Sequence, residues 1–338
     1  MQSIATNKKH LRKQDPVYHI VGKEDALLRI AILGAGAMGM LVGGYLSRRN
    51  EVCLVDVNRE LVETINRQGV RIHEPDGRVD TFRPAASADT TGMPPMDLIV
   101  VFVKSMYSRS ALENNSDLIG PDTFLMTLQN GSGHESTLLE FTKKDHVIIG
   151  TTLHNSAVTA PGEVLHGGGG ASYIGCLEGG ADRIQFIADT FTACGLETAC
   201  DADVQKLIWE KLFTNASASV LTGALQTPLG YISSNEHAWA VCETLIREAV
   251  AVANGDHMCF DVDEQLASVR QLCQRSSGGL TSIYADLRDG RRSEVDSING
   301  SVVRASRRNG VPAPSHEFIV HMIHAMEEKP QQARRDRR

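Results

Sequence analysis

Three polar side chains in the second half of the sequence stand at helical spacing. Lys211, Asn215 and Ser219 follow one another at intervals of four residues within the segment IWEKLFTNASASVLTGAL. If this segment is a helix, the three side chains lie along one face. An ammonium, an amide and a hydroxyl in a row are what a polar anionic substrate would need. On spacing alone, a solvated stripe on an ordinary helix is the simpler interpretation.

A later segment, LTSIYADLRDGRRSEVDSINGSVVRASRRNGVPAP, contains Ser282, Asp286 and Glu294. By itself Glu294 is typical of an acid at the start of a helix, where the helix dipole stabilises negative charge. Asp286 could act directly, or it could have a structural role, such as capping or pairing with Arg288 or Arg292. These residues need the context of the whole chain.

The elements that would position such residues are clearest around a glycine-rich turn, GAGAMG. The apolar run Ile30–Leu33 predicts a strand, Met38–Arg49 predicts a helix, and Val52–Val55 predicts a second strand that ends at Asp56. Strand, tight turn, helix, strand and acid in this order are typical of a dinucleotide-binding unit. A glycine-rich turn of some other α/β protein is the alternative, and the complete setting argues against it.

Each glycine of the turn has a physical role in this interpretation. Gly34 allows the tight turn, Gly36 lets the backbone approach a pyrophosphate, and Gly39 lets the helix pack close to the sheet. The phosphates would meet the N–H groups at the positive end of the helix. The expected contacts with the cofactor are Gly34, Gly36, Ala37, Met38, Gly39 and Asp56.

Two further apolar runs end in polar residues. Asp97–Val103 predicts a strand that leads to Lys104, and Phe124–Leu128 predicts one that leads to Gln129, Asn130 and Gly131. In open α/β sheets, ligands bind beyond the carboxyl ends of the strands. We therefore expect Lys104 and Asn130 at the same edge as the glycine turn.

The middle of the chain has β character. Residues 70–82 predict a hairpin with a Pro-Asp-Gly turn, and residues 147–175 are rich in β-forming residues. The glycine run 167–170 lacks the following helix and the Lys-Ser/Thr pair of a phosphate loop. We expect it to be a turn between antiparallel strands.

From about Asp201 the chain has a helical pattern nearly to its end, with predicted helices over residues 204–225, 238–254, 264–274, 294–309 and 317–327. Two helices are predicted before it, over residues 58–68 and 181–194. We predict an α/β protein with a Rossmann-type dinucleotide-binding domain over residues 27–200 and an all-helical domain over 201–328. Residues 1–26 would be an extension, and residues 329–338 a disordered tail.

Composition limits the class of protein. The fractions of 42% hydrophobic and 22% charged residues are ordinary for a globular protein, and the net charge of −7 argues against a general nucleic-acid binder. Seven scattered cysteines without a CxxC pair favour reduced thiols in the cytoplasm and give no support to a metal site. No apolar run reaches membrane-spanning length, so no membrane partner is expected.

Taken together, these motifs resemble the ketopantoate reductase (2-dehydropantoate 2-reductase) family from about Leu28 to Glu327. The matching pieces are GAGAMG, VFVK, QNG, KLFTN and the long segment that contains Glu294. The resemblance implies a Rossmann domain joined to a helical domain, as in 6-phosphogluconate dehydrogenase, with the active site in the cleft. It also implies reduction of the ketone of a branched 2-oxo acid by a nicotinamide cofactor, on the route to pantothenate.

The resemblance also assigns roles to residues. Lys211 would stabilise and protonate the developing oxyanion, and Glu294 would orient Lys211 and the substrate. The amide and hydroxyl side chains would hold the substrate, and Lys104 and Asn130 would line the nicotinamide–ribose end. The residues expected to bind substrate are Asn130, Asn215, Ser219 and Ser282.

The sequence departs from the family pattern at two places. Ser219 and Val220 stand where the family often has a second asparagine followed by proline. Asp56 ends the second strand, where members that use NADPH place a basic residue. A carboxylate there would bind the ribose hydroxyls and repel a 2′-phosphate, although Arg59 could partly reverse this. We therefore expect NAD(P)H as the cofactor, with NADH favoured.

Alternatives remain open at this point. A D-2-hydroxyacid dehydrogenase of the D-mandelate type, NAD-dependent and built on the same scaffold, would fit Asp56, Ser219 and Val220. A protein that only senses dinucleotides would not need Lys211 and Glu294 together.

No histidine belongs to a recognisable catalytic motif, and His154 is expected to be a surface or hydrogen-bonded residue. The long helices could serve a homodimer.

Overall fold

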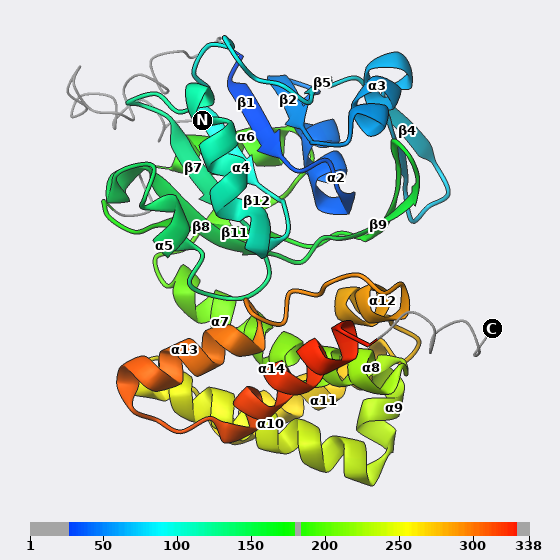
Figure 1. Cartoon of the computed structure of the whole chain (residues 1–338), viewed down its shortest axis with the longest axis vertical. Helices are drawn as coiled ribbons and strands as arrows, with labels where there is room; N and C mark the ends of the chain where they lie inside the picture. Colours follow the sequence, from blue (N-terminus) through cyan, green and yellow to red (C-terminus); the bar gives the residue numbers. More distant parts are fainter. Residues whose placement is uncertain (1–26, 180–183, 330–338) are drawn as a thin grey trace, which may run out of the picture. The chain divides into compact units, whose positions relative to one another are not determined.

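The computed structural model describes residues 27–179 and 184–329. The predicted extension over 1–26 and the predicted tail beyond residue 329 lie outside the described residues. The described chain forms two compact units (Figure 1). One contains residues 27–129 and 134–204, and the other contains residues 130–133 and 205–329.

The first unit is built on an eight-stranded sheet with the order β12-β11-β8-β7-β6-β1-β2-β5. The strands from β5 to β8 are parallel, and β11 pairs antiparallel with β8. The four expected apolar strands are confirmed, and the inner ones are buried on both faces, as parallel strands usually are. The bounds are β1 Arg29–Leu33, β2 Glu51–Val55, β5 Ala85–Ser87, β6 Leu98–Val101, β7 Phe124–Thr127, β8 Val147–Thr152, β11 Ser172–Cys176 and β12 Thr198–Cys200.

A second sheet, with the order β4-β3-β10-β9, belongs to the same unit. Its members are β3 Val70–His73, β4 Val79–Phe82, β9 Asn155–Ala160 and β10 Glu163–Gly168. The predicted hairpin is confirmed as β3 and β4. The expectation for the glycine run 167–170 was wrong, because the run joins β10 of this sheet to β11 of the main sheet. The strands that it joins do not pair with each other.

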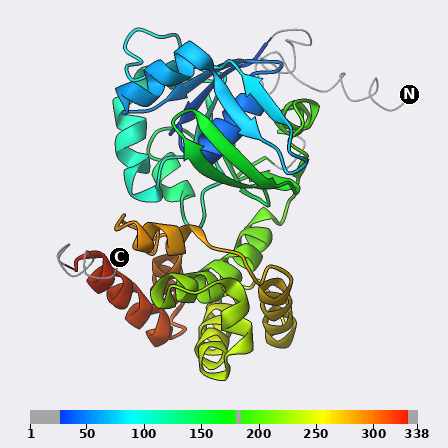
Figure 2. The same ribbon diagram turned by 90° about the vertical axis from the view of Figure 1, so that its right-hand side faces the viewer.

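Helix α2, Ala37–Leu46, packs against strands of both sheets. Figure 2 looks onto the cyan and green strands of the second sheet, with the blue α2 behind them. A Cβ on Gly43 would lie 2.4 Å from a methyl of Leu54, and a Cβ on Gly44 would lie 3.1 Å from Ile72. The helix is apolar on all sides because both of its faces are buried.

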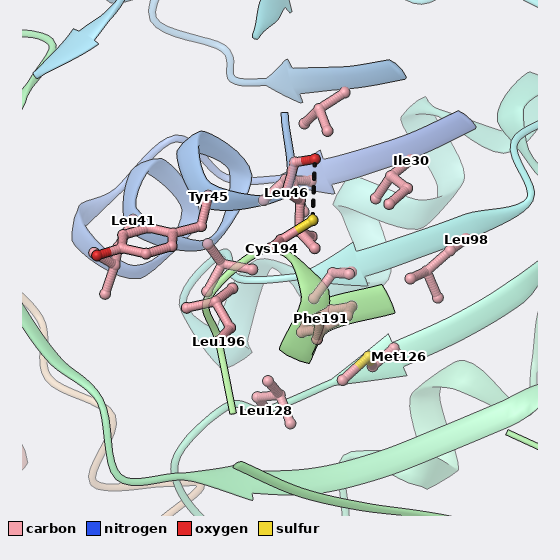
Figure 3. Packing of buried hydrophobic residues seen from close by; sticks show 14 of the residues in the cluster. Ile30, Leu41, Tyr45, Leu46, Leu98, Met126, Leu128, Phe191, Cys194 and Leu196 are labelled. Atoms are coloured by element: carbon pink, nitrogen blue, oxygen red, sulfur yellow. Dashed lines mark hydrogen bonds between the residues drawn. The ribbon is translucent and has the colours of Figure 1, made fainter. Parts of the chain in front are cut away.

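The core of the first unit extends from α2 across the main sheet to α6, Gln185–Ala193 (Figure 3). Phe191 is buried there, and the Cys194 thiol donates to the Leu46 carbonyl at 3.7 Å. The other helices of this unit are α3 Arg59–Gln68, α4 Ser108–Asn114 and α5 Glu135–Leu138, with 3₁₀ turns at Ser105–Tyr107, Ser116–Leu118 and Lys144–His146.

The second unit is helical, and the long helix α10 contacts α9, α11, α13 and α14. Two expectations need correction. The predicted helix over 204–225 contains a π-helical segment, Asn215–Ser219, and the helix expected from Glu294 begins only at Asn299. The bounds are α7 Val204–Thr214, α8 Val220–Leu225, α9 Leu229–Ser234, α10 Glu236–Gly255, α11 Val262–Arg275, α12 Ser282–Arg288, α13 Asn299–Asn309 and α14 Pro314–Glu327.

Candidate active site

The glycine turn has the geometry that a bound dinucleotide needs. Gly34 has φ +102°, and a Cβ there would lie 2.7 Å from the Val103 nitrogen. A Cβ on Gly39 would lie 1.8 Å from the Gly34 carbonyl oxygen, so only glycine allows this helix start. Gly36 is exposed, and a Cβ on it would meet no atom within 4 Å. The backbone at Gly36 is therefore open to a ligand.

Asp56 connects the turn to the end of β2. Its carboxylate accepts hydrogen bonds from the Ala35 N–H at 2.8 Å and from the Asn58 N–H at 2.9 Å. Each carboxylate oxygen takes one of these bonds and has a second lone pair for a further donor. Ala37 and Met38 open α2, where the first N–H groups of a helix have no partner within it. Asp56 therefore holds the turn and also presents acceptors beside it.

Lys104 follows β6 and is partly buried. The loop that begins there is held by Gln129, to which the sequence analysis gave no role. The Gln129 amide donates to the Val103 carbonyl at 2.6 Å and to the Ser108 hydroxyl at 2.9 Å. Its position directly after a buried strand is the signal that could have identified it. Gln129 links the ends of two neighbouring strands.

Asn130 opens a short loop that packs on the turn containing Glu294. Gly131 has φ +103°, and a Cβ there would lie 2.0 Å from the Ser297 carbonyl oxygen. The Ser132 N–H donates to that carbonyl at 3.3 Å, and the Ser297 hydroxyl donates to the Glu294 carbonyl at 3.0 Å. The loop that begins at Asn130 therefore lies against the turn that contains Glu294, although the two are far apart in the sequence. Gly131 is a further residue that sequence reasoning missed.

Lys211 lies in the last turn of α7 and is partly buried. Burial lowers the pKa of Lys211 to about 8, and the neighbouring Glu294 carboxylate opposes this effect by favouring the ammonium. A pKa near neutrality suits a group that must give up a proton at physiological pH. The expected partnership of Lys211 and Glu294 thus has an electrostatic basis.

Asn215 and Ser219 are the first and last residues of the π-helical segment. The Ser219 hydroxyl donates to the Asn215 side-chain oxygen at 3.5 Å. The Ser219 carbonyl accepts from the Thr281 hydroxyl at 3.3 Å, and Thr281 caps the helix that begins at Ser282. Ser282 itself is exposed. Hydrogen bonds therefore connect Asn215, Ser219 and the start of the helix that contains Ser282.

Asp286 is buried and forms an ion pair with Arg291 at 3.0 Å, while Arg288 pairs with Asp289. This contact gives Asp286 a structural role, although with a different arginine from those considered above.

His154 is hydrogen-bonded, as expected. It begins a row of polar side chains that includes His166 at 3.1 Å, then Glu74 at 2.8 Å from His166, and finally the Tyr45 hydroxyl, which donates to Glu74 at 2.6 Å. Within residues 27–179 and 184–329, no group of three or more His, Cys, Asp or Glu side chains could hold a metal ion. The same residues include no helix long and apolar enough to cross a membrane.

Curated relatives match nearly the whole chain. The 2-dehydropantoate 2-reductase of Halobacterium salinarum is 32% identical over 301 residues, which is 88% of this chain and 98% of the relative. The 2-dehydropantoate 2-reductase of Lactococcus lactis subsp. lactis is 29% identical over 308 residues, or 89% of this chain and 98% of the relative.

Solved structures agree with the fold. D-mandelate dehydrogenase with NADH and anilino(oxo)acetate superposes with a TM-score of 0.84 at 28% identity, covering 89% of this chain and 98% of that one. The 2-dehydropantoate 2-reductase from Geobacter metallireducens GS-15 gives a TM-score of 0.82 at 27% identity, covering 88% of this chain and 99% of that one.

Two family models account for both units. The model described as ketopantoate reductase PanE/ApbA matches residues 30–179, and the model described as ketopantoate reductase PanE/ApbA C terminal matches residues 203–327. Together with the relatives, these matches show that the chain belongs to the ketopantoate reductase PanE/ApbA family.

Proposed function

We propose that the protein is a 2-dehydropantoate 2-reductase, which reduces the ketone of 2-dehydropantoate by hydride transfer from NAD(P)H. The observation that carries this proposal is the partly buried Lys211 beside Glu294, with a pKa of about 8. A protein that only senses dinucleotides has no use for a lysine poised in this way. A relative named 2-dehydropantoate 2-reductase, which is 32% identical to this chain, supports the same conclusion.

The residues of the chain have distinct tasks in this reaction. The nicotinamide ring supplies a hydride when bound. Lys211 stabilises the negative charge that develops on the carbonyl oxygen and donates the proton that completes the alcohol. Glu294 keeps Lys211 charged and oriented. The Asn130, Asn215, Ser219 and Ser282 side chains provide donors and acceptors for the carboxylate and hydroxyl of the substrate.

The residues of the first unit fit a nicotinamide dinucleotide. The open backbone at Gly36 and the start of α2 would hold the pyrophosphate, with Lys104 toward the nicotinamide end. The Asp56 carboxylate, fixed by the Ala35 and Asn58 N–H groups, would accept from the ribose hydroxyls and repel a 2′-phosphate. NADH is therefore the preferred cofactor in this proposal.

A second candidate is a D-mandelate-type dehydrogenase that uses NAD. The specific observation in its favour is the TM-score of 0.84 with D-mandelate dehydrogenase in complex with NADH. Ser219 has a shorter side chain than the asparagine common in the reductases, which could make room for a larger 2-oxo acid. This alternative has the same cofactor preference and the same catalytic lysine, and differs only in the substrate side chain.

We also infer that the protein works in the cytoplasm. All seven cysteines lie within the described residues and are thiols rather than disulfides. This state is typical of a reducing compartment. Recovery of the native protein mainly from a secreted or membrane fraction would contradict the inference.

The test is a panel of steady-state rates with 2-dehydropantoate, 2-oxoisovalerate and phenylglyoxylate, each with NADH and with NADPH. We expect the highest kcat/KM with 2-dehydropantoate and NADH. A higher kcat/KM with phenylglyoxylate would favour the second candidate. A kcat/KM for NADPH about tenfold above that for NADH would reject the role given to Asp56. Tight binding of NADH without turnover of any of these acids would reject the reductase function itself.

A further inference from the structure

The π-helical segment Asn215–Ser219 begins and ends at two polar residues of the proposed substrate site. In a π turn the N–H groups bond five residues back instead of four, so one more residue fits within the turn. With 3.6 residues in an α-helical turn, conversion to α-helix would rotate everything after the segment by about 100° relative to Lys211. The π segment therefore determines the direction in which the polar side chains of this helical run point relative to Lys211.

Side chains of this helical run and of another helix donate hydrogen bonds to backbone carbonyls within or next to the π segment. The Ser217 hydroxyl donates to the Phe213 carbonyl at 2.5 Å. The Asn299 amide, from α13, donates to the Ala216 carbonyl at 2.8 Å. The Ser219 carbonyl accepts from the Thr222 hydroxyl at 2.7 Å. Such bonds offer carbonyl groups partners outside the regular helical ladder.

Asn299 is the clearest of these donors because it is fully buried and comes from another helix. Its amide nitrogen also lies 3.1 Å from Nδ1 of the buried His316, and Nε2 of His316 lies 2.9 Å from the Leu245 carbonyl. Burial lowers the pKa of His316, which favours the neutral ring. A carbonyl oxygen can only accept a hydrogen bond, so the proton is on Nε2 and Nδ1 accepts from Asn299. Each amide hydrogen of Asn299 then has a defined acceptor.

The orientation of the Asn299 amide follows from these partners. A flipped amide would place its oxygen against the Ala216 carbonyl and against an accepting ring nitrogen. In the observed orientation the Asn299 oxygen is buried without a hydrogen-bond partner among the described residues. The amide is held by its donated bonds, which connect the π segment through His316 to the central helix α10.

Thr222 anchors the other end of the segment. Its hydroxyl lies 2.7 Å from the Thr281 hydroxyl, and both hydroxyls reach the Ser219 carbonyl. Thr281 caps α12 by accepting from the Tyr284 N–H at 3.2 Å. The same group of hydroxyls therefore fixes Ser219 and the start of the helix that contains Ser282.

We propose that Asn299 and Thr222 are positioning residues for the 2-oxo acid, which rests on the function proposed above. They hold the π segment that directs Asn215 and Ser219, and they do not touch the substrate themselves. Neither residue was singled out by its place in the sequence, because Asn299 donates to the segment from another helix and Thr222 acts together with Thr281, which is distant in the sequence.

The variants Asn299→Ala and Thr222→Val test this proposal. Valine has nearly the shape of threonine and lacks the hydroxyl, so Thr222→Val keeps the test valid if Asn299→Ala fails to fold. We expect KM for 2-dehydropantoate to rise about tenfold in each variant, as for one lost hydrogen bond at the substrate. The Kd for NADH should stay within about twofold of the wild type, and amide hydrogen exchange over residues 211–225 should accelerate.

Two matched variants serve as controls. Asn309→Ala removes an amide on the same helix α13 that donates to a different helix carbonyl, that of Val252, at 2.8 Å. It should leave KM and the exchange of residues 211–225 unchanged. Thr222→Ser restores a hydroxyl and should recover most of the lost substrate affinity. A general loss of stability would affect the Asn309 variant as well.

The outcomes separate the two proposals. An active wild type whose KM is unchanged in both Asn299→Ala and Thr222→Val would overturn the positioning role and leave the reductase function standing. A rise in the Kd for NADH equal to the rise in KM would also overturn it, because the effect would then be global. A wild type without turnover of any 2-oxo acid would instead reject the function on which the positioning role rests.

Discussion

Lys211 is subject to two opposing effects. Its partly buried position disfavours the ammonium, and the Glu294 carboxylate favours it. The balance leaves the pKa of Lys211 at about 8, well below the ordinary value for lysine. An ordinary lysine would hold its proton too strongly to act as an efficient general acid at neutral pH.

This balance predicts a pH dependence for the reduction. Reduction needs protonated Lys211, so kcat/KM should be constant below about pH 7 and should fall as the pH rises through about 8. Oxidation of the alcohol needs the neutral amine, so its kcat/KM should rise over the same range. Both profiles can be measured with saturating cofactor.

The variant Glu294→Gln tests the cause of this pKa. Removing the carboxylate removes the effect that opposes burial, so the break in the reduction profile should move to lower pH. An unchanged break would mean that Glu294 does not act on the Lys211 ammonium.

Lys211→Ala should lower kcat by about two or more orders of magnitude and leave the Kd for NADH nearly unchanged. An unchanged kcat would remove Lys211 from the chemistry.

Residue types could be predicted from the sequence better than their contacts could. Lys211 and Glu294 were identified through motifs, but their coupling depends on the fold of the helical unit. Gln129 and Gly131 belong to a quoted motif, yet their roles depend on the Val103 and Ser297 carbonyls, which no local pattern specifies.

Helix α2 combines an open start with a buried body. Its first turn is open at Gly36, and its remaining residues from Gly39 onward are buried between sheets. The three glycines of the turn are therefore not equivalent. Gly36 is exposed to solvent, whereas Gly34 and Gly39 pack closely against backbone atoms.

This difference predicts that an alanine at one glycine lowers stability, whereas an alanine at the other weakens NADH binding. Gly39→Ala would place a Cβ on the Gly34 carbonyl oxygen and should lower the free energy of unfolding by about 3 kcal/mol or more. Gly36→Ala should leave that free energy within about 0.5 kcal/mol, because the new Cβ meets nothing. It should nevertheless weaken NADH binding about tenfold or more, since the methyl group would occupy the space of the pyrophosphate.

Urea unfolding and NADH titration of both variants would check these values. Each variant is the control for the other, since the chemical change is the same. Equal losses of stability would contradict the geometry of the turn, and undiminished NADH affinity of Gly36→Ala would place the pyrophosphate elsewhere.

Elements with local signals could be predicted, and those that depend on distant partners could not. The apolar runs of β1, β6 and β7 and the proline–glycine hairpin of β3 and β4 were identified. The second sheet was missed because β3 pairs with β10, which is about ninety residues away in the sequence. The π segment was missed because bonds from other helices, above all from Asn299, support it.

Across the whole molecule, each unit has its own core and a histidine whose pKa is lowered by burial. In the first unit, burial lowers the pKa of His154, and the nearby His166 acts in the same direction. In the second unit, burial lowers the pKa of His316. His324 differs: burial lowers its pKa, but the hydrogen bonds that its ring donates to the Asp296 and Glu327 carboxylates outweigh this effect and raise the pKa.

The sign of the effect on stability follows from proton binding. An unfolded histidine takes up its proton near pH 6.5, whereas His154 and His316 do so only at lower pH in the folded state. The unfolded state therefore binds more protons just below pH 6.5, and the free energy of unfolding falls as the pH is lowered. His324 contributes in the opposite sense, since its stabilising effect is present below pH 6.5 and is lost as the pH rises through its raised pKa.

We therefore predict that the first unit loses stability faster on acidification than the second, where His324 offsets His316. Amide hydrogen exchange between pH 5 and 7.5 would measure the free energy of unfolding of both units in one sample. The contribution of His154 to the slope of this free energy against pH should be below about 1.4 kcal/mol per pH unit. His154→Gln should flatten the slope for the first unit, and His237→Gln, at an exposed histidine, should change neither. If His154→Gln left the slope unchanged, the titration of His154 would not be the source of the acid sensitivity of the first unit.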